Sequence, residues 1–169
     1  MAGAALLLLA ATTASQPYPA AEVLNAFQTA CAHTRKFERL EKQLPKKGWQ
    51  ALPEGAEPRI AQLVSKGKAA LEDGEKLEGR EYRKTVAGRS LYLVTSRVTD
   101  KSGIWASGCR LYDFEAGAPI ADAKLVEWMK REPTHKQELP NGGVIRKWEP
   151  GWRNGVAVDV DFAGHGGEF

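Results

Sequence analysis

Cysteine and histidine are scarce in this chain, which has two cysteines and three scattered histidines in 169 residues. They do not recur at the ligand spacing of a zinc site. The motifs G-x-S-x-G, H-E-x-x-H and C-x-x-C are missing, and a phosphate-loop match around Gly67 and Lys68 fails because Gln62 and Ala69 stand where Gly and Ser or Thr are required. These absences exclude the commonest recognisable hydrolases and metalloenzymes, so we predict no catalytic residue, metal or cofactor.

An excess of one charge is also missing, because 24 basic residues face 21 acidic ones for a net charge of +3. We interpret this balance as a mixed, solvated surface rather than a concentrated positive field, and a nucleic-acid partner is not expected. The length and the apolar content are those of one ordinary domain, which we place at residues 20–162. Residues 163–169 are predicted to form a flexible C-terminal tail.

No hydrophobic run approaches the roughly 20 residues that a membrane-spanning helix needs. Residues 1–14 instead resemble a signal peptide, with an apolar run from Ala4 to Ala11 and small residues, Thr12 and Ala14, before a plausible cleavage point. We therefore expect a periplasmic or secreted protein with no stable membrane span in its mature form. The usual Lys or Arg before the run is absent, so an apolar N-terminus in a cytosolic protein is the alternative.

Apolar residues recur at steps of three and four from Ala20 to Leu44, which predicts one helix with Cys31 on its buried side. The opposite, charged face of this helix is interpreted as solvated. Two more helices are predicted, at Pro58–Leu71 and Ala121–Arg131, and loops are predicted at Glu72–Gly79 and Thr134–Gly143.

From Tyr82 onward the apolar period changes to two, which is typical of strands. A strand at Glu81–Ala87 is followed by a predicted hairpin of Leu91–Thr99 and Ile104–Phe114, in which Thr99 pairs with Ile104.

This register places Val94 opposite Cys109, so that Cys109 points into the core that also receives Cys31. A disulfide between the two cysteines is the expectation for an oxidising compartment, and two buried free thiols are the alternative.

The other face of this hairpin is predicted to be open. It would present apolar and aromatic side chains beside arginines, which is the ordinary composition of a contact site for a protein or small-molecule partner. The residues are Leu91, Leu93, Arg97, Arg110 and Tyr112. The alternative is that the third helix covers this face through Trp128.

A second hairpin is predicted over Gly142–Phe162, with a three-residue loop at Arg153–Gly155. In this register both Trp148 and Trp152 join the valines on one apolar face, so we interpret these rings as a core wall.

The opposite face of the second hairpin would set Lys147 across from Asp161 and Glu149 across from Asp159. The like-charged pair suggests a cation or basic-ligand site, and plain solvent exposure is the alternative. The candidate residues are Glu149, Asp159, Asp161 and His165.

Together these patterns predict an α+β protein: a single two-layer domain with an antiparallel sheet of about five strands, packed against the N-terminal helix and one or two further helices. The function hypothesis is an exported, non-catalytic binding or interaction domain. The rival hypothesis is a small hydrolase or metal-dependent enzyme that uses Asp159, Asp161 and His165. A structural or dimer-forming envelope protein is a third possibility.

Overall fold

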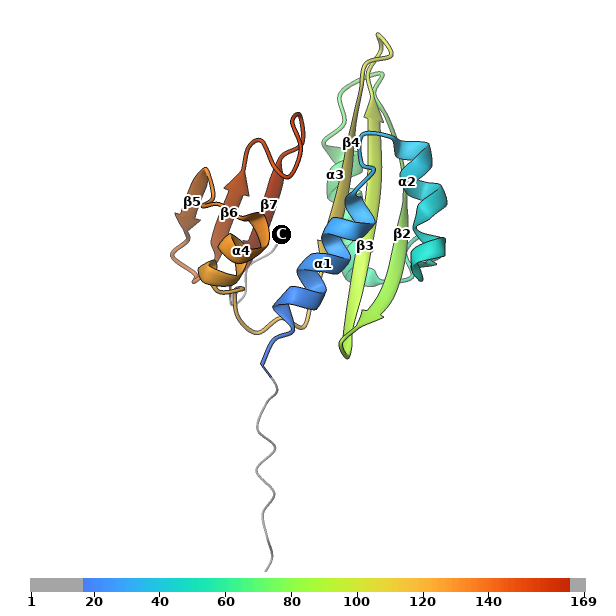
Figure 1. Cartoon of the computed structure of the whole chain (residues 1–169). Coiled ribbons are helices and arrows are strands. Elements are labelled where there is room, and N and C mark those ends of the chain that lie inside the picture. The colour runs from blue at the N-terminus through green and yellow to red at the C-terminus, as the bar shows by residue number, and fades with distance from the viewer. Residues whose placement is uncertain (1–16, 165–169) are drawn as a thin grey trace, which may run out of the picture.

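The computed structural model describes residues 17–164, and the predicted signal peptide and His165 lie outside this range. Within it the chain forms two antiparallel sheets accompanied by four α-helices (Figure 1). The α+β class, with antiparallel strands packed against helices, is confirmed; the strand count differs, because the strands form a sheet of four and a sheet of three where one sheet of about five was predicted. None of the helices in the described range is long and apolar enough to cross a bilayer.

The helices are α1 (Ala20–Cys31), α2 (Phe37–Gln43), α3 (Pro58–Ala69) and α4 (Asp122–Met129), with a 3₁₀ turn η1 at Pro45–Lys47. The four-stranded sheet has the order β1 (Gln50–Ala51), β2 (Lys76–Val86), β3 (Arg89–Thr99) and β4 (Trp105–Tyr112). The three-stranded sheet has the order β5 (His135–Glu138), β6 (Val144–Trp148) and β7 (Val158–Phe162). Strands β2 and β5 therefore occupy parts of the two segments that were predicted to be loops.

The predicted helix from Ala20 to Leu44 is broken into α1 and α2 at residues 32–36. At the break Thr34 gives both its backbone N–H and its hydroxyl to the carbonyl of Cys31, at 3.1 and 2.6 Å. Threonine competes in this way with the helical bonding pattern, so the helix ends and the chain changes direction. The second helix then buries Phe37 and Leu40 against the sheet.

The first core lies between the four-stranded sheet and the pair α1 and α2. Strand β4 pairs with β3 so that Thr99 is opposite Trp105 and Thr95 is opposite Cys109. This register differs by one residue from the predicted one, which exchanges the two faces of β3. The cysteine-bearing face is therefore the one that carries Leu93, and the disulfide between Cys31 and Cys109 ties α1 to it.

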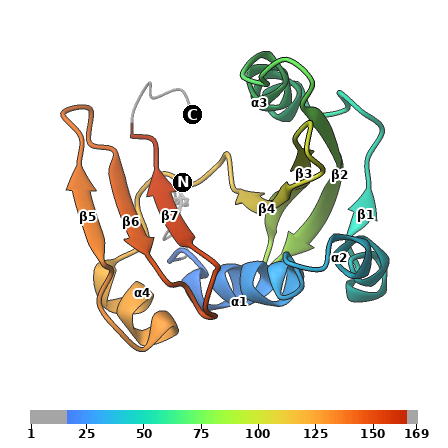
Figure 2. The same ribbon diagram turned by 90° about the horizontal axis from the view of Figure 1, so that it is seen from above.

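The exposed contact surface predicted on this hairpin is accordingly wrong for its two leucines. Both Leu91 and Leu93 have 0% exposed surface and belong to the first core. The cover is supplied by α1 and α2, not by the helix that contains Trp128. Figure 2 shows α1 and α2 on one side of this sheet and α3 on the other.

The second core forms where α4 and α1 meet the three-stranded sheet, around Leu125, Trp148 and Val158. The pairing of β6 with β7 sets Trp148 opposite Val158 and Lys147 opposite Asp159, two residues away from the predicted register. A slip of two residues keeps every side chain on its face. Trp148 is fully buried and Trp152 packs against both cores, so the interpretation of these rings as core is confirmed.

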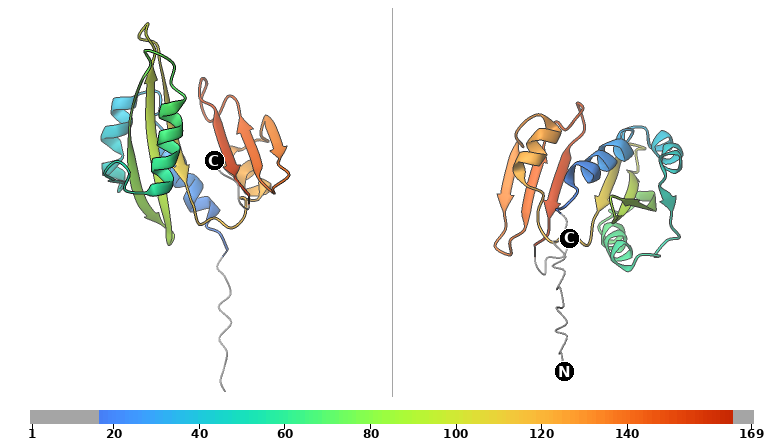
Figure 3. Two further views of the ribbon diagram at one scale, coloured as in Figure 1. Left: turned by 180° about the vertical axis from the view of Figure 1, so that it is seen from behind. Right: turned by 60° about the horizontal axis from the view of Figure 1, so that its bottom comes forward.

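Helix α1 is the element that the two cores share. Leu24 lies in the second core, Val23 lies in the first, and Phe27 packs against both. The ring of Phe27 lies 5.3 Å from that of Trp152 and 6.2 Å from that of Trp128, measured between centroids. Figure 3 shows α1 between the two sheets in both of its views.

Candidate functional site: a basic surface on α2

Helix α2 packs its apolar residues against the sheet, and both of its acidic residues pair with side chains of the sheet. Glu41 is largely buried and accepts hydrogen bonds from the hydroxyls of Tyr82, at 2.7 Å, and Thr95, at 2.5 Å. Glu38 forms an ion pair with Arg97 at 2.5 Å. Burial of the apolar side chains sets the orientation of the helix about its axis. The two carboxylates pair with side chains of β2 and β3.

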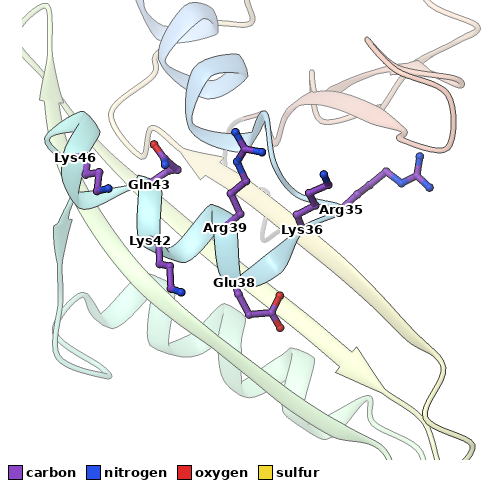
Figure 4. A pocket seen from close by; sticks show the side chains of 7 residues that line it. All are labelled: Arg35, Lys36, Glu38, Arg39, Lys42, Gln43 and Lys46. Atoms are coloured by element: carbon purple, nitrogen blue, oxygen red, sulfur yellow. The ribbon is translucent and has the colours of Figure 1, made fainter.

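The outer side of α2, with the residues just before and after it, is left with basic side chains. Figure 4 shows them extending from the helix around a shallow hollow, which Gln43 and Glu38 also line. We call this set the α2 basic surface: Arg35, Lys36, Arg39, Lys42 and Lys46, all of them exposed. Within residues 17–164 none of the five forms an ion pair within 4 Å.

The concentration of charge here is greater than the composition of the whole chain indicates. Residues 35–47 contain six Lys or Arg and two Glu, a net charge of +4, whereas the complete chain has a net charge of only +3. The remainder of the molecule is therefore close to neutral, and the expected evenly mixed surface is wrong for this region. Positive charges gathered in one place produce a positive electrostatic potential, and such a surface attracts anions.

Two neighbouring groups respond to this positive field. Partial burial, together with the charges of Arg39 and Lys47, lowers the pKa of His33 below its ordinary value. Burial, with a contribution from Arg39, likewise lowers the pKa of Lys47. In both cases burial is the larger cause, and the neighbouring cations shift the pKa in the same direction.

The segment that leads into the α2 basic surface is fastened at several points. The disulfide holds Cys31 against β4, and the hydroxyl of Ser107 donates to the carbonyl of Thr34 at 2.6 Å. Arg35 donates to the backbone carbonyl of Asn154 at 3.2 Å. At the other end Lys47 donates to the carbonyl of Thr29 at 2.5 Å. The backbone that carries the cations is therefore arranged before any ligand binds.

The other residues of the predicted contact site are divided between the two faces of the sheet. Arg97 lies on the covered face, where its guanidinium stands 4.9 Å from the ring centroid of Phe37 and pairs with Glu38. Arg110 and Tyr112 lie on the opposite face, where Tyr112 stacks on Phe114 at 5.6 Å between centroids. The structure thus does not bring the five predicted residues together.

The predicted cation site also has a different arrangement. Lys147 stands opposite Asp159 and forms an ion pair with Glu149 at 2.9 Å, so a lysine supplies the positive charge between these carboxylates. Asp161 lies opposite Ile145, and His165 falls outside the described residues. Among residues 17–164 no group of three His, Cys, Asp or Glu side chains is placed to hold a metal ion.

Searches of family models, curated proteins and solved structures find no match to this chain.

Four of the five cations of the α2 basic surface, Arg35, Lys36, Arg39 and Lys42, belong to the charged helix face that was interpreted as solvated, so the surface was not predicted as a site. A single helix over Ala20–Leu44 would have placed Glu38 and Glu41 among the basic residues on one solvated face. The break at residues 32–36 gives the second helix its own orientation about its axis, and in that orientation Glu38 and Glu41 pair with side chains of β2 and β3. The usable signal was the local count of charges in residues 35–47.

Proposed function

We propose that the protein is an exported, non-catalytic binding module that holds an anionic ligand on the α2 basic surface. The observation that carries this proposal is the difference in pairing: the five exposed cations have no ion-pair partners among residues 17–164, while Glu38 and Glu41 pair with side chains of the sheet. A cationic surface on a fastened backbone binds anions with little loss of conformational entropy.

Export is supported by two features. The apolar start of the chain matches a signal peptide, and the disulfide between Cys31 and Cys109 is the kind of bond that persists in oxidising compartments. A binding role rather than catalysis is supported by the shape and composition of the surface, which is a shallow basic hollow and carries no nucleophile beside a general base.

The first test is binding of a soluble polyanion. Fluorescently labelled inorganic polyphosphate should bind the mature protein, and the affinity should fall as KCl is raised because the charges are exposed to screening. The triple variant Lys36→Gln/Arg39→Gln/Lys42→Gln should weaken binding by about 10- to 100-fold, since each exposed cation contributes about 0.5 to 1 kcal/mol. Fluorescence anisotropy measures both effects.

A matched control removes the same charge elsewhere. The variant Lys68→Gln/Lys76→Gln/Lys124→Gln changes three exposed lysines on α3, β2 and α4, and it should bind polyphosphate within about twofold of the wild type. Equal losses in the two triple variants would mean that only net charge matters and would refute a site on α2.

A further inference from the structure

The turn between β3 and β4 exposes the two most accessible large hydrophobic side chains of the described residues. Ile104 is 71% exposed and Trp105 is 46% exposed, and they are adjacent in the chain. Figure 1 shows this turn projecting beyond the neighbouring helices at the end of the sheet. Adjacent exposed apolar side chains at a projecting tip are a feature of surfaces that bind a partner or a membrane.

The turn that presents these side chains is well ordered by its own hydrogen bonds. One carboxylate oxygen of Asp100 accepts from the backbone N–H of Ser102, from the Ser102 hydroxyl and from the backbone N–H of Ile104, at 2.7 to 2.9 Å. The N–H of Asp100 also donates to the carbonyl of Ile104 at 2.9 Å. The exposure of Ile104 is therefore built into the turn.

Trp105 lies on β4 two residues before the point where this strand contacts the segment that leads into α2. It is on the same face of β4 as Ser107, whose hydroxyl donates to the carbonyl of Thr34. The next residue of the chain after Thr34 is Arg35, the first cation of the surface. Two residues along a strand span about 7 Å, so the backbone of Trp105 lies roughly that far along β4 from the contact with the residue before Arg35.

We propose that the anionic partner is the surface of a lipid bilayer that contains anionic phospholipids, with the α2 basic surface on the headgroups and Ile104 and Trp105 entering the interface. This inference rests on the anion-binding function proposed above and names its ligand class. Lysine and arginine are attracted to anionic headgroups, and tryptophan prefers the boundary between headgroups and acyl chains.

The composition of the surface favours a bilayer over a nucleic acid. Single-stranded nucleic acids are held by aromatic rings interleaved with the cations, on which the bases stack. The aromatic rings nearest to these cations in the chain, Phe37 and Trp49, are both buried. The exposed apolar pair lies instead on the separate turn between β3 and β4, where it can add an apolar contact with a membrane interface to the electrostatic one.

Sedimentation with vesicles tests this proposal. The mature protein should sediment with vesicles of phosphatidylcholine and phosphatidylglycerol at 7:3 and should remain in solution with phosphatidylcholine alone. Lys36→Gln/Arg39→Gln/Lys42→Gln should lower the partition coefficient by at least tenfold, because each cation near an anionic surface contributes about fivefold. The control Lys68→Gln/Lys76→Gln/Lys124→Gln should partition like the wild type.

The apolar tip is tested separately from the charge. Ile104→Ser/Trp105→Ser should lose at least tenfold in vesicle partitioning while its affinity for polyphosphate is unchanged, and Ile104→Leu/Trp105→Phe should keep both. Partitioning that is insensitive to Ile104→Ser/Trp105→Ser would overturn the proposal.

The two proposals can fail independently. Binding of polyphosphate without binding of anionic vesicles would overturn the bilayer as partner and leave a soluble anion as the ligand of the α2 basic surface. Binding of neither would refute the anion-binding function itself, and the bilayer proposal would fall with it.

Discussion

Glu81 lies on the side of β2 that faces the chain leading into α3, and it is only 7% exposed. Its carboxylate accepts a hydrogen bond from the backbone of Gly55, but among the described residues its Oε2 atom has no hydrogen-bond partner. Burial, with a smaller contribution from Glu54, raises the pKa of Glu81, while Lys68 opposes the shift. Folding therefore disfavours the ionised form of this side chain relative to the unfolded chain.

We predict that Glu81→Gln stabilises the protein by about 1 kcal/mol at pH 7, since a buried charge without a full set of partners is replaced by a neutral group of the same shape. A pKa raised by folding gives stability that is present below the ordinary value of about 4.3 and is lost as the pH rises through the folded value. The advantage of the variant should thus vanish near pH 4.

Urea denaturation at a series of pH values measures the pH dependence of this difference. Glu115→Gln, which changes an exposed glutamate, is the control and should show no such dependence. A stability difference between Glu81→Gln and wild type that is constant from pH 4 to pH 7 would contradict the assignment.

At the scale of the element, the two hairpins show which part of a register can be predicted from sequence. Alternation of apolar residues identified β3, β4, β6 and β7, but the length of each connection was misjudged. The predicted register of β6 and β7 was wrong by two residues, which preserves the faces of the strands. Trp148 was therefore predicted on the correct, buried face although its partner on β7 was wrong. The predicted register of β3 and β4 was wrong by one residue. This error exchanged the two faces of the hairpin, so that Leu93, a core residue, was predicted to be exposed.

The cause of the second error is local to the turn. The hydrogen bonds of Asp100 with Ser102 and Ile104 close a connection that keeps Ile104 out of the paired strands, so that Thr99 meets Trp105. The connection therefore has one residue more than the apolar pattern indicated. The pattern of apolar residues predicts which side chains share a face of a strand. It does not predict the number of residues in a turn that is closed by side-chain hydrogen bonds.

The disulfide is the element-scale contact with the clearest expected energy. It joins residues 78 positions apart, for which the chain-entropy model gives at most about 4.5 kcal/mol. We predict that Cys31→Ser/Cys109→Ser lowers the free energy of unfolding by about 2 to 4 kcal/mol in urea denaturation. The wild type in a reducing agent should match the variant. A loss below 1 kcal/mol would show that packing of α1 alone holds it on the sheet.

Two features belong to the molecule as a whole: the concentration of positive charge on the α2 basic surface, and the packing of helix α1 against both cores. Neither is a local property of the sequence. Residues 35–47 contain the cations of the α2 basic surface, but only the packed structure shows that Glu38 and Glu41 pair with side chains of the sheet and leave those cations without ion-pair partners among residues 17–164. The exported binding module could be proposed from sequence alone. Its binding surface could not, because that depends on how the helices roll against two separate sheets.

The shared helix makes a final prediction possible. Phe27 on α1 contacts both cores, and it meets Trp128 and Trp152 on the side of the three-stranded sheet. We predict that Phe27→Ala lowers the free energy of unfolding by about 2 to 3 kcal/mol, less than for a fully buried ring. Because this ring joins the cores, the loss should also uncouple them.

Hydrogen exchange resolved by residue measures the coupling between the sheets. In the wild type the most protected amides of β3 and of β6 should exchange with similar free energies, and in Phe27→Ala those of β6 should exchange at a free energy lower by at least 1 kcal/mol. Val160→Ala, which removes contact from the second core alone, is the control for a loss without uncoupling. If β3 and β6 still open together in Phe27→Ala, the cores are joined through contacts other than this ring, and Trp152, which also packs against both, becomes the residue to change.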